Sequence, residues 1–124
     1  LILLDAPCSG FGVVRRKPDI KWAKTPEDVQ AIAELQQTLL ESAHRLLKRG
    51  GTLIYSTCTL AAAENGEQTA RFVAMHPEFS FDAAAGGNVP GKVLERCSAG
   101  VGQLLITPAD FGSDGFYMAR MIRA

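Results

Sequence analysis

A long amphipathic helix between two strand-like segments constrains the fold of this chain more than any other feature. Residues 1–4 form a continuous apolar run typical of a buried strand, and residues 52–57 form a second strand-like run. Between them, Thr25 is a suitable helix N-cap, Pro26 suits the first helical position, and the glycines at 50–51 end the helix. A strand, a helix and a strand in this order are typical of α/β proteins with a parallel sheet.

The apolar residues of this predicted helix recur at steps of three and four positions, which predicts one buried stripe. The residues of the stripe are Val29, Ile32, Leu35, Leu39, Ala43 and Leu46. Lys48 and Arg49 follow them, and their charges suit the negative C-terminal end of the helix dipole.

The rest of the chain continues the alternation of strands and helices. The further elements that we predict are a helix over about 62–76, strands at 79–81, 103–107 and 116–122, and a long loop rich in glycine and alanine over 83–102. Pro77 stops the second helix. The prediction is therefore an α/β fold with a mostly parallel sheet and an antiparallel pair of strands at its edge.

Composition places the chain among globular domains and narrows its function. It has 124 residues, of which 47% are hydrophobic, with 13 Lys and Arg against 13 Asp and Glu. Because the formal net charge is zero, a nucleic-acid interface would require a local basic patch. The sequence contains no run of 18 apolar residues and no signal-peptide pattern, which favours a cytoplasmic protein. Since the chain begins with Leu1 inside a strand, we expect a single partial domain of a longer protein.

Two of the three cysteines follow the predicted strands. Cys8 lies shortly after the first strand and Cys58 at the end of the second. For either thiol alone, packing as a small buried hydrophobe is the more frequent role. Both are flanked by small polar or turn-forming residues, however, and ligands gather at the carboxyl ends of parallel strands. If the two strands are neighbours, both thiols face one crevice. Cys97, in the predicted loop, is interpreted as structural.

The sequence lacks the residue patterns that several other kinds of site require. The cysteines form no Cys-x-x-Cys pair, and His44 and His76 lie on predicted helices without ligand spacing, so no metal site is predicted. Neither histidine has a reason to lie near a thiol, as a Cys–His hydrolase would require. The two Gly-x-Gly segments lack the third glycine of a dinucleotide-binding loop, and the sequence has no P-loop.

Four short motifs follow one another along the chain. They are Leu-Asp-Ala-Pro-Cys-Ser-Gly at 4–10, Arg-Arg-Lys-Pro-Asp-Ile-Lys-Trp at 15–22, Tyr-Ser-Thr-Cys-Thr at 55–59 and Asp-Gly-Phe-Tyr-Met-Ala-Arg at 114–120. Together they closely resemble the C-terminal half of the NOL1/NOP2/Sun family of RNA cytosine-5 methyltransferases, with the bacterial Sun-type 16S rRNA enzymes nearest. The resemblance covers nearly the whole chain.

The resemblance implies a fold, a cofactor and roles for three residues. It implies the C-terminal half of a Rossmann-like methyltransferase sheet over residues 1–124, with S-adenosylmethionine as methyl donor and 16S rRNA as substrate. The family's Thr-Cys thiol is the nucleophile, which corresponds to Cys58, and its Pro-Cys thiol assists product release, which corresponds to Cys8. The family's aspartate at the cofactor site corresponds to Asp5. Its glycine-rich cofactor loop lies upstream, so the isolated chain is expected to bind the donor weakly and to be inactive.

Methylation at cytosine C5 is a reaction in which thiols are useful. A thiolate that adds to C6 makes C5 nucleophilic enough to attack a sulfonium methyl group, and a base must then remove the C5 proton so that the thiol can leave. The residues alone do not decide which thiol attacks, because DNA cytosine-5 methyltransferases use their Pro-Cys thiol. Two alternatives stay open: a DNA substrate, and a non-catalytic RNA-binding or assembly module that keeps the fold.

A cluster of basic residues lies between the two motif cysteines, Cys8 and Cys58. Five Lys and Arg residues occur within 15–24, and as ordinary surface charge they need no functional explanation. The family resemblance favours a further role, and we predict that Arg15, Arg16 and Lys21 contact RNA phosphates.

Beyond the second motif cysteine, the stretch Ala63–Glu67 is interpreted as helix capping.

Overall fold

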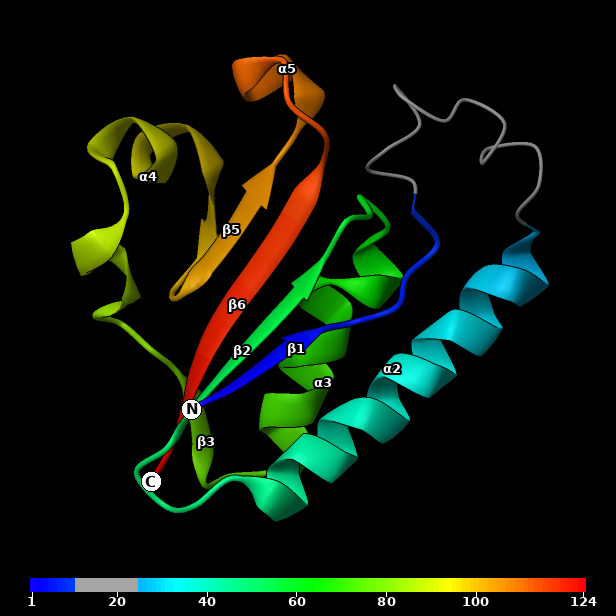
Figure 1. The fold of residues 1–124 in the computed structure, drawn as a ribbon, viewed down its shortest axis with the longest axis vertical. Coiled ribbons are helices and arrows are strands. Elements are labelled where there is room, and N and C mark those ends of the chain that lie inside the picture. The colour runs from blue at the N-terminus through cyan, green and yellow to red at the C-terminus, as the bar shows by residue number, and fades with distance from the viewer. Residues whose placement is uncertain (11–24) are drawn as a thin grey trace.

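A six-stranded mixed sheet organises the computed structural model, which describes residues 1–10 and 25–124 (Figure 1). Its strands are β1 (Ile2–Asp5), β2 (Thr52–Thr57), β3 (Phe79–Phe81), β4 (Ser98–Gly100), β5 (Gln103–Ile106) and β6 (Phe116–Arg123). The order across the sheet is β1-β2-β6-β5-β4, and β3 also pairs with β6. The β1–β2 pair is parallel, and the other pairs between described strands are antiparallel.

Helices flank this sheet at both ends. The described helices are α2 (Pro26–Leu46), α3 (Gly66–Met75), α4 (Gly91–Cys97) and α5 (Pro108–Phe111), with short 3₁₀ turns at Ala62–Glu64 and Ala85–Asn88. α2 packs against β1 and α3, whereas α4 packs against β4 and β5 at the other end of the sheet (Figure 1). Among the described residues, no helix has the length and apolar character that crossing a membrane requires.

The α/β fold expected from the sequence is confirmed. The structure gives β2 and β3 the predicted bounds, and β5 and β6 form the expected antiparallel pair. The antiparallel part of the sheet is larger than that pair, because β6 also pairs with β2 on one side and with β3 at its C-terminal end. The long strand β6 is therefore the centre of the sheet.

The start of α2 follows the predicted capping chemistry. Thr25 has an extended backbone and its hydroxyl accepts a hydrogen bond from Asp28 N at 3.2 Å, while Thr25 N donates to the Asp28 carboxylate at 3.0 Å. This reciprocal pair is a capping box, which satisfies two amide groups that the first turn leaves without a helical partner. The helix ends at Leu46, a few residues before the predicted glycine stop.

The buried face of α2 differs from the predicted stripe. Leu35 and Leu46 are 47% and 76% exposed, whereas Gln36 is 0% exposed and Leu40 and Ala43 are buried. The face turned toward the sheet is therefore rotated from the one that the spacing of apolar residues predicts. A polar residue lies at its centre because Gln36 reaches a group of buried polar side chains described below.

Two further predictions need correction. The helix expected over 62–76 is interrupted at Asn65, where a 3₁₀ turn ends and α3 begins. The loop expected over 83–102 contains a 3₁₀ turn, α4 and the short strand β4. These elements are short and depend on tertiary packing: a Cβ on Gly86 would lie only 3.3 Å from the side chain of Leu94. Local composition therefore gave little sign of them.

The hydrophobic core lies between α2, α3 and one face of the sheet. Along β2 and β6 buried side chains alternate with more exposed ones, as expected for strands with one buried face. The core residues are Ala6, Leu40, Ala43, Leu47, Leu53, Tyr55, Phe72, Phe79, Tyr117, Ala119 and Met121. Two of them are tyrosines, and their hydroxyl groups bond within the fold: that of Tyr117 lies 2.7 Å from both Thr69 Oγ1 on α3 and Gln103 Oε1 on β5.

We expect Tyr117→Phe to lower the free energy of unfolding by about 1–2 kcal/mol, because the buried Thr69 hydroxyl loses its cross-element partner. Urea denaturation followed by circular dichroism measures this change. Ser80→Ala removes a hydroxyl from an exposed position on β3 and should change the free energy by less than about 0.5 kcal/mol. Equal effects of the two substitutions would contradict the proposed role of the Tyr117 hydroxyl.

Candidate active site

Two cysteine thiols meet where the parallel strands β1 and β2 end. The register pairs Ile2 with Leu53 and Asp5 with Ser56, so both chains leave the sheet at the same edge. Cys58 follows β2 directly and Cys8 lies three residues after β1, and their Sγ atoms are 3.1 Å apart. Both residues are half-buried. The prediction that the two strand ends bring the thiols together is confirmed.

The environment of Cys8 favours its protonated form. Burial raises the pKa of the Cys8 thiol to about 11, and the hydrogen bond with Cys58 adds to this effect. Cys8 therefore remains a thiol at neutral pH. As a thiol it can donate its proton toward the Cys58 sulfur across the 3.1 Å contact.

Asp5 lies beside the thiols at the same edge of the sheet. It is the last residue of β1, its side chain is exposed, and its Oδ1 accepts a hydrogen bond from Ser56 Oγ at 3.1 Å. Ala6 N also donates to Ser56 O at 2.9 Å, which continues the pairing of the two chains beyond β1. An exposed carboxylate in this place can accept hydrogen bonds from a hydroxyl or amino group of a small molecule.

A buried carboxylate, for which the sequence predicted only helix capping, lies against the loop that carries Cys8. Glu64 is 0% exposed and accepts hydrogen bonds from Ser9 N at 2.8 Å and Ser9 Oγ at 2.7 Å. Gln36 Nε2 lies 3.1 Å from the same carboxylate and 2.8 Å from Pro7 O. Glu64 thus contacts the loop that carries Cys8 and also helix α2.

The next residue, Asn65, holds the loop that carries Cys58. Its side-chain oxygen accepts a hydrogen bond from Thr57 Oγ1, and its Nδ2 donates to Thr59 O at 2.8 Å. Asn65 makes no side-chain capping bond to α3. The interpretation of Ala63–Glu67 as helix capping is therefore wrong for Glu64 and Asn65. Their acidic and amide side chains near the Thr-Cys motif were the only available signal in the sequence.

Cys97 is buried, as expected for a structural cysteine, and lies at the end of α4. Burial is the main reason why the pKa of its thiol is raised, and the nearby Asp110 carboxylate raises it further. Cys8 and Cys58 follow β1 and β2, whereas Cys97 leads into β4 at the other end of the sheet. Its surroundings give it no part in the thiol pair.

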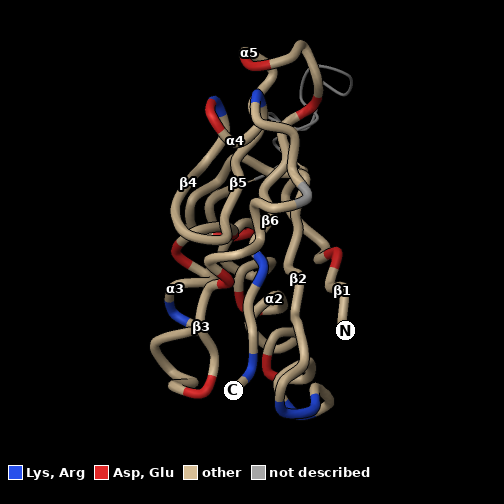
Figure 2. The backbone as a smooth tube through the Cα atoms, turned by 90° about the vertical axis from the view of Figure 1, so that its left-hand side faces the viewer, with Lys and Arg blue, Asp and Glu red and all other residues tan. Residues whose placement is uncertain are grey.

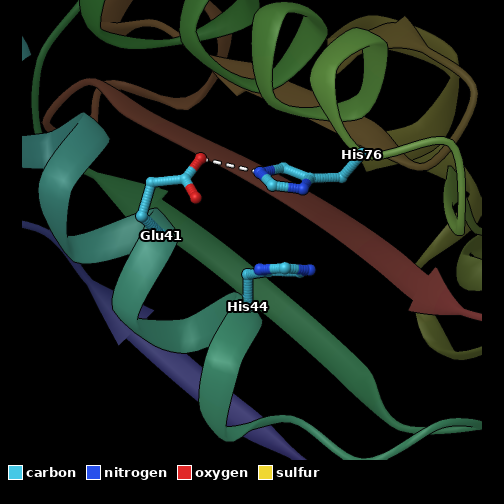
Figure 3. A group of neighbouring side chains, drawn as sticks. All are labelled: Glu41, His44 and His76. Carbon is cyan, nitrogen blue, oxygen red and sulfur yellow. Dashed lines mark hydrogen bonds and ion pairs between the residues drawn. The ribbon is translucent and has the colours of Figure 1, made fainter.

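Both histidines lie far from the thiols along the strands, in one cluster with two carboxylates. Glu41 and His44 come from α2 and His76 follows α3 (Figure 3). The imidazole rings stack with their centroids 4.0 Å apart, His76 Nε2 lies 2.7 Å from Glu41 Oε1, and His44 Nε2 lies 2.7 Å from Glu78 Oε1. Ligand atoms of Glu41, His44 and His76 lie within 4.8 Å of one another. The spacing of these residues along the helices did not reveal this grouping. Each Nε2 atom already has a carboxylate partner.

The basic residues predicted to contact RNA lie outside the part of the chain that the structure describes. This applies to Arg15, Arg16 and Lys21. Along the described backbone, Lys and Arg are interspersed with Asp and Glu (Figure 2).

A cavity of about 430 Å³ lies between α4 and the strands of the sheet. Its lining comes mainly from β4, β5, β6, α4 and the residues before α4, with Ile54 from β2, and includes Leu94, Leu104 and Met118. Neither thiol nor Asp5 belongs to the lining. The cavity is thus separate from the candidate active site.

Comparisons with known proteins agree with the motifs. A family model described as 16S rRNA methyltransferase RsmB/F matches residues 1–122. A probable ribosomal RNA small subunit methyltransferase B of Bacillus subtilis (strain 168) is 48% identical over 120 residues, which are 97% of this chain and 26% of that protein. The chain spans about a quarter of the length of the curated relatives it matches.

Two solved structures from Pyrococcus horikoshii have the same fold. NSun6 with SFG superposes with a TM-score of 0.76 at 30% identity, over 98% of this chain and 29% of that one. A methyltransferase homologue protein superposes with a TM-score of 0.73 at 26% identity, over 99% of this chain and 38% of that one. These matches confirm the predicted Rossmann-like methyltransferase fold and the resemblance stated from the four motifs. The chain belongs to the 16S rRNA methyltransferase RsmB/F family.

Proposed function

We propose that this chain is the C-terminal part of the catalytic domain of a cytoplasmic RNA cytosine-5 methyltransferase that acts on 16S rRNA. Membership of the RsmB/F family supports an rRNA methyltransferase. The observation that supports cytosine-5 chemistry is the contact between Cys8 and Cys58 at the carboxyl ends of β1 and β2. A non-catalytic module would have no need of two thiols in contact at this edge.

In the proposed reaction, the Cys58 thiolate adds to C6 of the target cytosine and forms a carbon–sulfur bond. The electron pair of the C5–C6 double bond becomes available at C5, which takes up a methyl group. S-adenosylmethionine, when bound, would supply that methyl as an electrophile and leave as the neutral thioether when its sulfur–methyl bond breaks. A base then removes the C5 proton, the double bond re-forms, and the C6–sulfur bond breaks to return the Cys58 thiolate.

Two properties of the thiol pair and the family resemblance support this division of roles. The Cys8 pKa of about 11 keeps Cys8 protonated at neutral pH, which suits a proton donor better than an attacking nucleophile. Its 3.1 Å contact lets it stabilise the Cys58 sulfur as that sulfur departs from C6. The family resemblance also assigns attack to the Thr-Cys thiol and release to the Pro-Cys thiol.

Asp5 fits one part of a methyl-donor site. Its exposed carboxylate lies at the thiol edge and can accept a hydrogen bond from a hydroxyl or amino group of the donor. We further propose that the other contacts to S-adenosylmethionine come from outside this chain, which spans about a quarter of the length of its curated relatives. The isolated chain would then bind the donor weakly and show no turnover.

The assignment of the two thiols is tested by their separate removal from the full-length protein. We expect Cys58→Ala to lower the rate of methylation by at least about a thousandfold and to abolish the covalent complex with RNA, because the attacking sulfur is lost. Cys8→Ala should still form the complex and should accumulate it. Denaturing gel electrophoresis with labelled RNA measures both outcomes.

Cys97→Ala is the matched control for these substitutions, because Cys97 lies outside the thiol pair. It should leave the amount of covalent complex unchanged. Accumulation of the complex in Cys58→Ala and its loss in Cys8→Ala would reverse the two roles. A covalent complex that forms with DNA but not with RNA would show that the substrate is DNA.

The protonation of Cys8 makes a prediction about its alkylation. With a pKa of about 11, roughly one Cys8 in a thousand is a thiolate at pH 8. Because the thiolate is the reactive form, the alkylation rate should rise about tenfold per pH unit and should still be rising at pH 10. Iodoacetamide labelling with peptide mass spectrometry gives this rate. A plateau below pH 9 would show that the folded protein does not raise this pKa, and urea-unfolded protein supplies the ordinary profile.

Contact of the basic stretch with phosphates is tested by charge reversal. If Arg15 and Arg16 each neutralise one phosphate of single-stranded RNA, the double substitution Arg15→Glu, Arg16→Glu should lower the salt slope of log K by about 1.4. Binding measured over a series of salt concentrations gives this slope. The control is Lys48→Glu, Arg49→Glu, an exposed pair of cations between α2 and β2. Equal slopes for both double variants would remove the proposed contact.

A further inference from the structure

We propose that Glu64 is a positioning residue for the two thiols: its buried carboxylate holds the loop that carries Cys8 against the loop that carries Cys58. The inference rests on the proposed function only for the catalytic role of the two thiols. The geometry itself stands on hydrogen bonds between described residues. Glu64 touches neither sulfur in any of these bonds, so its effect would pass through the loops.

The contact with the first loop runs through Ser9, the neighbour of Cys8. The Ser9 amide donates to Glu64 Oε1 at 2.8 Å and the Ser9 hydroxyl donates to Oε2 at 2.7 Å. One carboxylate therefore fixes both the backbone and the side chain of the residue after Cys8. Ser9 is 2% exposed, so these bonds are shielded from water.

The contact with the second loop runs through Thr59, the residue after Cys58. Thr59 Oγ1 lies 3.3 Å from Glu64 Oε2 and 2.8 Å from Ser9 Oγ. Ser9, Thr59 and Glu64 thus form a closed triangle, and each of the two thiols is one residue away from a corner. A change in any side of the triangle should change the separation of the sulfurs.

Helix α2 supplies the third support. Gln36 Nε2 lies 3.1 Å from Glu64 Oε1 and 2.8 Å from the carbonyl oxygen of Pro7. The carbonyl of Pro7 immediately precedes Cys8, so the loop is held on both sides of the thiol. This contact explains why a glutamine lies at the centre of the buried face of α2.

The chemistry of the partners calls for a carboxylate in this position. A carboxylate has only acceptor atoms: Oε1 accepts from the Ser9 amide and from Gln36 Nε2, and Oε2 accepts from the hydroxyl groups of Ser9 and Thr59. Glutamine at position 64 would place an NH₂ group at one of the two oxygen positions, where it cannot accept a hydrogen bond from the groups that now donate to that oxygen. Glu64→Gln would therefore keep the shape of the side chain while breaking part of the triangle.

The rate at which the two thiols form a disulfide measures their separation directly. In the full-length protein treated with diamide, we expect Glu64→Gln to slow formation of the Cys8–Cys58 disulfide by at least about tenfold, because hydrogen bonds to a charged group are lost. Peptide mass spectrometry identifies and quantifies the bond. Glu67→Gln is the matched control: it makes the same chemical change three residues along, at an exposed position, and should leave the rate unchanged.

A readout of catalysis separates positioning from general destabilisation. Glu64→Gln should lower kcat for RNA methylation by at least about tenfold while KM for S-adenosylmethionine stays within twofold, because Glu64 contacts the thiol loops. Ser9→Ala keeps the carboxylate and its bond from the Ser9 amide, and removes the two hydrogen bonds of the Ser9 hydroxyl, to Thr59 Oγ1 and to Glu64 Oε2. It should slow disulfide formation about threefold, and should add little to Glu64→Gln in the double variant.

Thermal unfolding shows whether each variant is folded at the temperature of the assay. If Glu64→Gln is unfolded there, Ser9→Ala alone decides, and an unchanged disulfide rate in it would overturn the proposal. If Glu64→Gln is folded, a rate equal to that of Glu67→Gln would overturn it. Because disulfide formation does not require Cys58 to attack cytosine, failure of the proposed function would leave this result standing.

Discussion

The parallel pairing of β1 with β2 is the constraint on which the candidate active site depends. In its register Asp5 faces Ser56, and one further backbone bond from Ala6 to Ser56 extends the pairing past the end of β1. Cys8 and Cys58 then leave the sheet at one edge, although 50 residues separate them in the chain. A slip of one residue would turn the side chains of β1 to the opposite face and separate these groups.

Strand pairing brings the thiols near each other, and buried polar groups determine how they are held. Glu64, Gln36, Ser9 and Thr59 are shielded from solvent and bond to one another. Burial of a carboxylate is unfavourable unless several donors compensate for the lost water. Apolar side chains could have filled the same volume with less demand on geometry. The buried polar side chains instead fix distances, because a hydrogen bond weakens steeply when its atoms move apart or out of line.

The parts of this structure that the sequence predicted are those with local causes. The start of α2 follows from Thr25 and Asp28, which lie three residues apart, and the bounds of β2 follow from its β-rich composition between a glycine pair and a cysteine. The meeting of the thiols required only the order strand, helix, strand. The buried face of α2 and the role of Glu64 were missed, because the bonds of Glu64 to Ser9 and of Gln36 to Pro7 and Glu64 join residues 28 to 55 positions apart in the chain. Hydrophobic spacing cannot identify a polar residue that is buried by such distant contacts.

A chain of hydrogen bonds connects the fourth sequence motif to the thiol site, although the motif does not touch either thiol. Tyr117, on the central strand β6, bonds through its hydroxyl to Thr69 in α3 and to Gln103 in β5. Thr69 N in turn donates to the carbonyl of Asn65, whose side chain holds both Thr57 and Thr59 around Cys58. β6 also pairs directly with β2 along the full length of β2. A motif distant in sequence from both thiols thus contacts Thr69 near the start of α3, and Asn65, which directly precedes α3, carries the side chain that holds the Cys58 loop.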